Sequence, residues 1–222
     1  MKRISLALAI ALAVPGLALA QDADRKVAGG GIAVAGWKGK IDAAATKKGL
    51  TLNDSKFAKS GDELHLTIGP AAYYWNDSNT ARGNFTVGAT FKEAKPSAGH
   101  PHPYGIFIGG KDLETDAPTM VYCVAYSSGQ YLVRGFAAGK VVNIAARAAH
   151  DAVAKPGADG SVTQNIQWTV KDGVASCSVN GQVVATVDGA TLAGHGITSV
   201  DGPFGIRASH NLDVVVTGFG KK

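Results

Sequence analysis

Alternation of apolar and polar residues, the pattern of a half-buried β-strand, recurs through most of this chain. It is seen at residues 63–68 (ELHLTI) and 84–92 (NFTVGATFK), where every second side chain is apolar or small. Further strands are predicted at residues 104–108, 119–126, 131–136, 166–170, 174–179, 183–187, 204–208 and 212–217. The pattern therefore predicts a chain built mostly from β-strands.

Turn residues separate several of these strands. Asp172-Gly173 and Asn180-Gly181 favour tight hairpins, because a type I′ turn needs positive φ at both central residues. Residues 41–48 and 144–153 are rich in Ala but lack a clean apolar stripe, so at most one or two short helices are expected. Many short strands and 29 glycines favour a β-sandwich or barrel.

The N-terminus has the features of an export signal. Lys2 and Arg3 precede the uncharged apolar run Ile4–Val14, and the small residues of Ala18-Leu19-Ala20 suit a signal peptidase. The alternative is a membrane anchor, but Pro15 interrupts the run before the ~20 apolar residues that a spanning helix needs. We therefore expect residues 1–20 to be a signal peptide and the protein to be periplasmic or secreted.

The rest of the chain is long enough for one domain with its own core. We expect a loose N-terminal lead at residues 21–35 and a single β-sandwich domain at residues 36–222. Without Lys2 and Arg3 the formal net charge falls from +5 to about +3, and no basic stripe is present, so nucleic acid is not an expected partner. No later apolar stretch predicts membrane insertion after signal cleavage. The pattern gives no oligomeric state.

The two cysteines, Cys123 and Cys177, each lie in a strand-like run with small or apolar neighbours at alternate positions. This spacing places both on inward faces. In an oxidising compartment an even pair favours a disulfide, worth ~4 kcal/mol on the chain-entropy estimate. Two buried free thiols are the alternative. Neither cysteine has the basic, exposed surroundings of a catalytic thiol.

Four segments carry a resemblance to known proteins: residues 69–75 (GPAAYYW), 104–110 (YGIFIGG), 179–184 (VNGQVV) and 202–207 (GPFGIR). In this order they resemble the concanavalin A-like lectin/glucanase superfamily, and within it the exported bacterial DUF1080 (3-keto-disaccharide hydrolase-like) domains. The resemblance implies an all-β, two-sheet antiparallel jelly-roll sandwich. In sugar-active members of the superfamily it also implies a ligand groove on the concave face or at the loop rim. These segments are mostly turn and core residues, so they indicate fold better than function.

Glycoside hydrolysis needs a pair of carboxylates flanking the scissile bond. Asp112, Glu114 and Asp116 alternate and would share one side of an extended segment. Glucanases of the superfamily use a Glu-first pattern of alternating acids within a strand. Here the triplet begins with Asp and follows Gly109-Gly110, so a solvated acidic loop is the favoured interpretation.

The segment His100-Pro101-His102-Pro103-Tyr104 brings two imidazoles close together on a backbone stiffened by proline. His100 and His102 could ligate a divalent metal with a third donor from elsewhere in the chain, although a single His-x-His pair is a weak motif. The alternative is a rigid polar loop, which together with Tyr104 could also form a wall of a saccharide site. No other cofactor is indicated.

Tyr73, Tyr74 and Trp75 form an aromatic cluster that is followed by Asn76 and Asp77. Aromatic rings that stack on sugar C–H faces, with amides and carboxylates beside them, are the chemistry that a saccharide site requires. Adjacent strand residues point to opposite faces, so at least one ring, Tyr74 by preference, is expected in the core.

Arg134 interrupts an otherwise apolar predicted strand (YLVRGF). An arginine on a sheet face can bind a hydroxyl pair or a carboxylate, or it can point to solvent, and the sequence favours neither.

The sequence leaves three functions open. The preferred one is an exported carbohydrate-binding domain whose partner is a glycan or small saccharide, with the site near residues 73–79, 100–104 and 134. The second is a glycoside hydrolase that uses acids among Asp112, Glu114 and Asp116. The third is a structural or protein-interaction module, stabilised by a metal at His100 and His102.

Overall fold

The structure, a computed structural model, describes residues 22–222; the predicted signal peptide lies outside the described residues. The strands are β1 (Gly31–Ile32), β2 (Trp37–Ile41), β3 (Lys56–Ser60), β4 (Glu63–Ile68), β5 (Ala72–Ala81), β6 (Phe85–Glu93), β7 (Tyr104–Lys111), β8 (Thr119–Tyr126), β9 (Gln130–Ala137), β10 (Lys140–Ala149), β11 (Val162–Lys171), β12 (Val174–Val179), β13 (Gln182–Asp188), β14 (Gly202–Ala208) and β15 (Leu212–Lys221). The helices are α1 (Ala43–Thr46), α2 (Gly189–Gly194) and a 3₁₀ turn (Leu52–Asp54).

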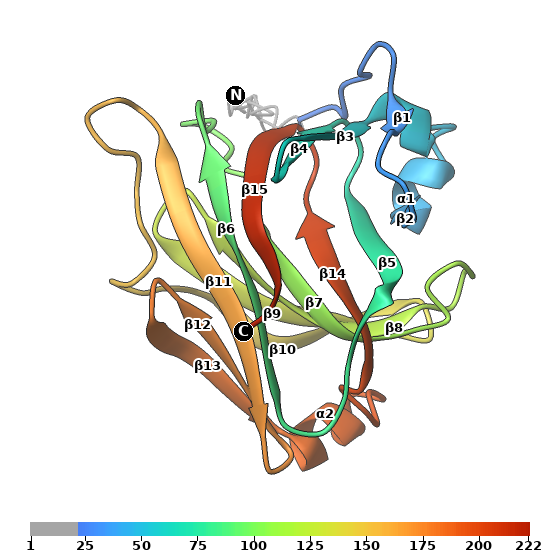
Figure 1. Ribbon diagram of the computed structural model, residues 1–222, viewed down its shortest axis with the longest axis vertical. Coiled ribbons are helices and arrows are strands. Elements are labelled where there is room, and N and C mark those ends of the chain that lie inside the picture. Colours follow the sequence, from blue (N-terminus) through green and yellow to red (C-terminus); the bar gives the residue numbers. More distant parts are fainter. Residues whose placement is uncertain (1–21) are drawn as a thin grey trace, which may run out of the picture.

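These strands form two sheets that pack face to face (Figure 1). The eight-stranded sheet has the order β1-β3-β4-β15-β6-β11-β12-β13, and the seven-stranded sheet has the order β10-β9-β8-β7-β14-β5-β2. The two-residue β1 pairs in parallel with β3, and the other strand pairs are antiparallel. The last two strands enter different sheets, with β14 between β7 and β5 and β15 between β4 and β6.

The core lies between the sheets and follows the alternation of the strands. On β8, Val121, Cys123 and Ala125 point inward to the core, whereas Tyr122 and Val124 point to the outer face of the sheet. Unlike an ordinary half-exposed strand, β8 is buried on both faces from Met120 onward. Something other than the opposite sheet therefore covers its outer face.

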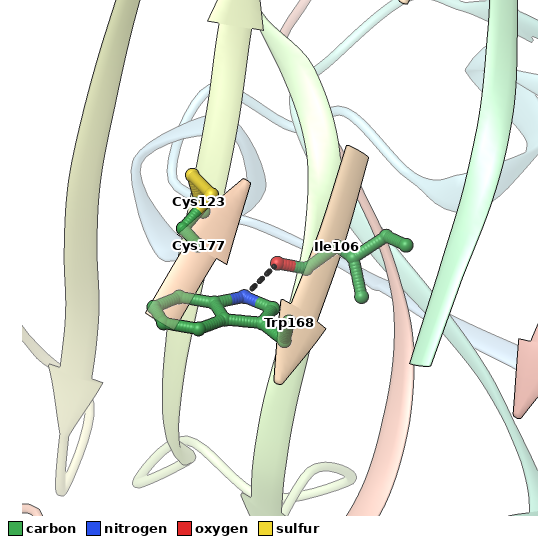
Figure 2. The surroundings of a disulfide bond; sticks show 4 residues. All are labelled: Ile106, Cys123, Trp168 and Cys177. Carbon is green, nitrogen blue, oxygen red and sulfur yellow. Dashed lines mark hydrogen bonds between the residues drawn. A yellow bond between two sulfur atoms is a disulfide. The ribbon is translucent and has the colours of Figure 1, made fainter. Parts of the chain in front are cut away.

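Two adjacent tethers join the sheets at the centre of the core (Figure 2). Cys123 on β8 and Cys177 on β12 form a disulfide, as predicted. The indole Nε1 of Trp168 on β11 donates a hydrogen bond to the carbonyl oxygen of Ile106 on β7, at 3.0 Å. Trp168 is the strand partner of Cys177, and Ile106 is the strand partner of Cys123, so the covalent and hydrogen-bonded tethers lie side by side.

Each strand predicted from alternation is present, with ends that differ by a few residues. Five strands were not predicted: β1, β2, β3, β5 and β10. The helical turn considered for the Ala-rich segment 144–153 is wrong, since residues up to Ala149 continue β10, which is an edge strand. Pairing with β9 supplies the backbone hydrogen bonds that its composition alone does not specify.

The segment predicted as a loose N-terminal lead is held against the sandwich. Arg25 donates a pair of hydrogen bonds to the carboxylate of Asp213, both 2.8 Å, and two more to the carbonyl oxygens of Ile68 and Leu212. Within residues 22–222, no helix has the length and hydropathy that a bilayer-spanning segment requires.

Candidate functional site

The outer face of the seven-stranded sheet carries a second apolar cluster, separate from the core. We call this surface the aromatic face. Its members share the outward positions of β5, β7, β8 and β9, joined by one loop residue; they are Tyr73, Trp75, Phe107, Leu113, Met120, Tyr122, Val124, Tyr126, Leu132 and Phe136. An outer sheet face is usually polar, so this composition marks the surface as unusual.

Aromatic side chains form a continuous row across this face. The ring centroids of Trp75 and Tyr73 are 5.6 Å apart, those of Tyr73 and Phe136 6.3 Å, and those of Phe136 and Tyr122 5.9 Å. These spacings are in the range of favourable aromatic contacts. A pocket lies at each end of the row.

The first pocket, about 280 Å³, lies at the Trp75 end and is lined in part by Asp77, Asp112 and Glu114. Trp75 is buried, and its Nε1 donates to Asp77 at 3.0 Å. Tyr73 is buried too, because the loop after β7 covers it and accepts a hydrogen bond from its hydroxyl at the carbonyl of Leu113, 2.8 Å away.

Two lysines of β2 pair with Asp77 of β5 and with two acids of this loop. Lys38 forms ion pairs with Asp77 and Glu114, and Lys40 contacts Asp116 at 2.9 Å. Hydrogen bonding to these lysines holds the pKa of Asp77 and of Asp116 below the ordinary range. Glu114 and Asp116 therefore fasten the loop over the row of rings, and they stay exposed.

The second pocket, about 390 Å³, lies at the Tyr122 end; we call it the arginine pocket. Its lining combines apolar side chains with two arginines, two histidines and two tyrosines. The lining residues are Pro101, His102, Pro103, Tyr122, Val124, Tyr126, Leu132, Arg134, Arg207, Ser209 and His210. The exposed surface of this lining is more polar than apolar, and its polar groups converge on one concavity, as the groups that orient a small ligand do.

Arg207 lies at the floor of the arginine pocket, only 8% exposed. Its guanidinium donates to both carboxylate oxygens of Asp42, at 2.7 and 2.6 Å, and lies 5.3 Å from the ring centroid of Tyr122. This pair is a planar, bidentate arrangement in a poorly solvated place. Arg207 was not among the predicted site residues, although it interrupts an apolar strand (PFGIRA) in the same way as Arg134.

Arg134 faces outward from β9, between Leu132 and Phe136 and opposite Tyr122 on β8. Its Nε donates to Asn143 of β10 at 2.6 Å. Thus the structure places Arg134 on the aromatic face, in the pocket lining.

A neighbouring arginine, Arg147 of β10, covers the ring of Tyr126, with its guanidinium carbon 3.8 Å from the ring centroid. Its Nε donates to Gln130 at 2.9 Å, and one terminal nitrogen donates to Ser128 at 3.3 Å. Arg147 was not predicted as a site residue either, because its segment was considered for a helix.

The two histidines of the predicted metal pair do not converge. His100 is exposed, whereas His102 is buried and makes an edge contact with His210, with ring centroids 4.1 Å apart. His102 Nε2 lies 3.3 Å from Asp22. Burial and the neighbouring His210 hold the pKa of His102 below its ordinary value. Among residues 22–222, no three His, Cys, Asp or Glu side chains are grouped so as to hold a metal ion.

Two further predicted residues lie away from both pockets. Tyr104 is fully buried in the core, where its ring stacks on Phe91 at 5.4 Å. Asn76 points to the opposite side of β5 from Trp75; it accepts hydrogen bonds from the backbone and hydroxyl of Ser78 and lines a different surface hollow with Trp37. The structure thus divides the predicted ligand residues among two pockets, the core and one edge.

Comparison with known proteins was informative for structures alone, since no family model and no curated protein matches this chain. The carbohydrate-binding module CBM66 from Bacillus subtilis superposes with a TM-score of 0.59 at 9% identity, over 87% of this chain and 99% of that one. A Bacillus subtilis protein of unknown function with a galectin-like fold gives 0.58 at 14% identity, over 83% and 88%.

The laminarinase catalytic domain from Thermotoga maritima gives a TM-score of 0.50 at 12% identity, over 85% of this chain and 84% of that one. The fold is a concanavalin A-like jelly roll. The predicted fold class is therefore confirmed, and the architecture is one that carbohydrate-binding and glycoside-cleaving proteins share. The disulfide is consistent with an oxidising compartment.

Proposed function

We propose that this protein is an exported carbohydrate-binding protein and that its saccharide site is the arginine pocket at the Tyr122 end of the row of rings. The observation that carries the proposal is the arginine pocket itself, a concavity of about 390 Å³ on the outer face of one sheet. It offers the terminal guanidinium nitrogens of Arg134 beside the phenol of Tyr122 and the buried Arg207–Asp42 pair. Donors that converge on one pocket in this way suit the hydroxyls and ring oxygens of a sugar.

Binding is favoured over hydrolysis by the state of the acids in the other pocket. A glycoside hydrolase needs one carboxyl group that stays protonated long enough to act as general acid, so its pKa must be raised. The pKa of Asp77 and of Asp116 is instead lowered by lysines, and Glu114 is paired with Lys38. These acids act in our proposal as fasteners of the loop that covers Tyr73.

The hydrolase remains the second candidate because Asp77, Asp112 and Glu114 line one pocket beside Trp75. Its test is turnover of a broad panel of glycosides by the wild-type protein and by a variant with Asp112, Glu114 and Asp116 all replaced by Ala. Turnover that the triple variant loses would replace our proposal by catalysis at these residues.

Export, a mature chain that starts at Gln21, a single domain over residues 36–222 and the likeness to DUF1080 domains belong to the same proposal. The signal-like N-terminus and the disulfide support export. N-terminal sequencing of the protein recovered from the periplasm or medium tests it, with Gln21 expected as the first residue.

The binding test uses the full chain, expressed with its own leader and purified after export. Titration calorimetry against saccharides chosen from a broad glycan array is expected to give a saturable heat for at least one of them. Replacing Arg134 by Ala and Tyr126 by Leu together should abolish that heat. A matched variant on the other sheet, Gln167→Ala with Thr169→Ala, should leave it unchanged. A purified, folded protein that binds nothing on the array overturns the proposal.

A further inference from the structure

The two ends of the aromatic face differ in whether their positively charged side chains pair with carboxylates. At the Trp75 end, Lys38 and Lys40 each have a carboxylate partner. Within residues 22–222, Arg134 and Arg147 form no ion pair with any carboxylate; their side-chain partners are the neutral Asn143, Gln130 and Ser128. The arginine pocket therefore presents uncompensated positive charge at Arg134, and Arg147 adds a second positive charge beside the pocket, over Tyr126.

These two guanidinium groups are oriented rather than free. The bond from Arg134 Nε to Asn143 leaves the two terminal nitrogens of this lining residue without an acceptor among residues 22–222. Arg147 is held flat over Tyr126 by cation–π contact and by its bonds to Gln130 and Ser128. Arginines fixed in this way lose little side-chain entropy when they bind a ligand.

Each of the two tyrosine rings that line the pocket has a guanidinium group beside it. Arg147 covers Tyr126, and Arg207 lies over Tyr122 at 5.3 Å and over Phe136 at 5.6 Å. A ligand in this pocket thus meets guanidinium planes and donors more than bare aromatic faces. That surface differs from the bare ring on which a neutral sugar stacks.

We infer that the arginine pocket selects an anionic saccharide, with Arg134 donating two parallel hydrogen bonds to a carboxylate or sulfate oxygen pair and Arg147 supplying the second positive charge. This inference rests on the proposed saccharide site and specifies its ligand class. The planar fork of arginine matches a carboxylate or a sulfate ester. Arg207 is not available for this role, because Asp42 already occupies its fork.

The test compares matched ligands that differ in charge alone. Calorimetry would use a uronic acid trisaccharide, the same trisaccharide after reduction of its carboxyl groups to alcohols, and a sulfated trisaccharide, each at low and at moderate ionic strength. The uronate or the sulfated sugar is expected to bind at least ~10-fold more tightly than the reduced form, since a hydrogen bond to a charged group is worth that much. The arm that binds identifies the anionic group.

Variants then assign the effect to residues. Arg134→Gln should weaken binding of the anionic trisaccharide by ~10-fold or more and of the reduced form by much less, so that the preference for the anion is lost; Arg147→Gln should reduce that preference by less. Arg134→Lys, which keeps the charge but not the fork, should recover only part of the loss. The charge-matched control, Lys92→Gln with Lys171→Gln, removes two exposed cations from strands of the other sheet and should have no effect.

The possible outcomes distinguish failure of this inference from failure of the proposed saccharide site. Equal affinity for the anionic and the reduced trisaccharide overturns the inference and leaves the saccharide site standing. An equal loss in the Lys92/Lys171 control shows general charge attraction and overturns the inference too. Absence of binding to any saccharide overturns both.

Discussion

The outer faces of the two sheets differ in composition although both belong to one sandwich. On the eight-stranded sheet the outward residues are mostly small and polar, and they bond to one another: Thr86 to Thr169 at 3.1 Å, and Asn165 to Thr90 at 3.1 Å. On the seven-stranded sheet the outward residues are aromatic rings and arginines. Since both sheets bury their inner faces alike, the fold does not require this difference.

The difference shows which outer face is explained by the fold alone and which is not. On a solvated sheet face, hydroxyls and amides that hydrogen-bond to one another leave few polar groups to bind a ligand. An outer face with buried rings and unpaired guanidinium groups carries a cost that folding alone does not reward. We therefore assign function to the seven-stranded sheet, and the following experiments test that division.

The largest expected effect comes from the disulfide that holds the sheets, and so both outer faces, together. Replacing Cys123 and Cys177 by Ala opens a cross-link with a sequence separation of 54 residues. On the chain-entropy model the free energy of unfolding should fall by about 4 kcal/mol, as measured by urea denaturation. A loss below about 1 kcal/mol would mean that the neighbouring bond from Trp168 to Ile106 already holds the sheets.

The Asp42–Arg207 pair tests whether an ion pair at the aromatic face contributes to the stability of the fold. Asp42→Asn leaves the buried guanidinium without its countercharge, which should cost about 3 kcal/mol in the free energy of unfolding. The double variant Asp42→Asn with Arg207→Met removes the charge as well, and should recover much of that loss. Equal stability of the wild type and Asp42→Asn would contradict the role assigned to this pair.

The buried carboxyl group of Glu93 on β6 should make the free energy of unfolding depend on pH. Its side chain is 4% exposed, and burial, with a smaller effect of Asp213, raises its pKa to about 7 from 4.5. The folded state then holds a proton that the unfolded state releases, so this contribution is complete below pH 4.5 and is lost as pH rises through 7. The loss should approach about 3 kcal/mol for a fully buried group.

The measurement is urea denaturation of the wild type and of Glu93→Gln between about pH 4.5 and 8. The Gln variant keeps the shape but cannot titrate, so the difference between the two proteins isolates Glu93 from the histidines. Parallel pH curves would show that burial does not raise the pKa of Glu93 in the folded protein.

The smallest effect is expected on the outer face of the eight-stranded sheet. Thr86→Val with Thr169→Val removes one hydrogen-bonded pair at a partly solvated position, and should change the free energy of unfolding by no more than about 0.5 kcal/mol. Saccharide affinity should stay unchanged in calorimetry. Loss of affinity in this variant would break the distinction between the two faces.

Local alternation made much of this fold predictable, and long-range contact limited the rest. Cys123 and Cys177 were placed on inward faces from their neighbours alone, and the structure joins them. The Asp42–Arg207 pair spans 165 residues in sequence and leaves no local pattern. In the same way, His102 meets His210 rather than His100, because β7 and β14 are neighbours in the sheet.

The candidate site was predicted less well than the fold for a physical reason. Trp75 and Asp77 do share one face of a strand, but whether a ring is open or covered depends on a loop that crosses it, here the one carrying Leu113 and Glu114. The unpaired state of Arg134 likewise depends on which carboxylates the fold brings near. Neither property is encoded in the spacing of neighbouring residues.

The central position of β14 and β15 has a consequence for how the chain must fold (Figure 1). Until residues 202–221 are available, β7 has no connection to β5, and β6 has none to β4, so each sheet is divided into two parts. A nascent or truncated chain would then expose open strand edges on both sheets, which are templates for aggregation. Completion of this sandwich is therefore a late event that awaits the C-terminus, with the slow kinetics of non-local strand pairing.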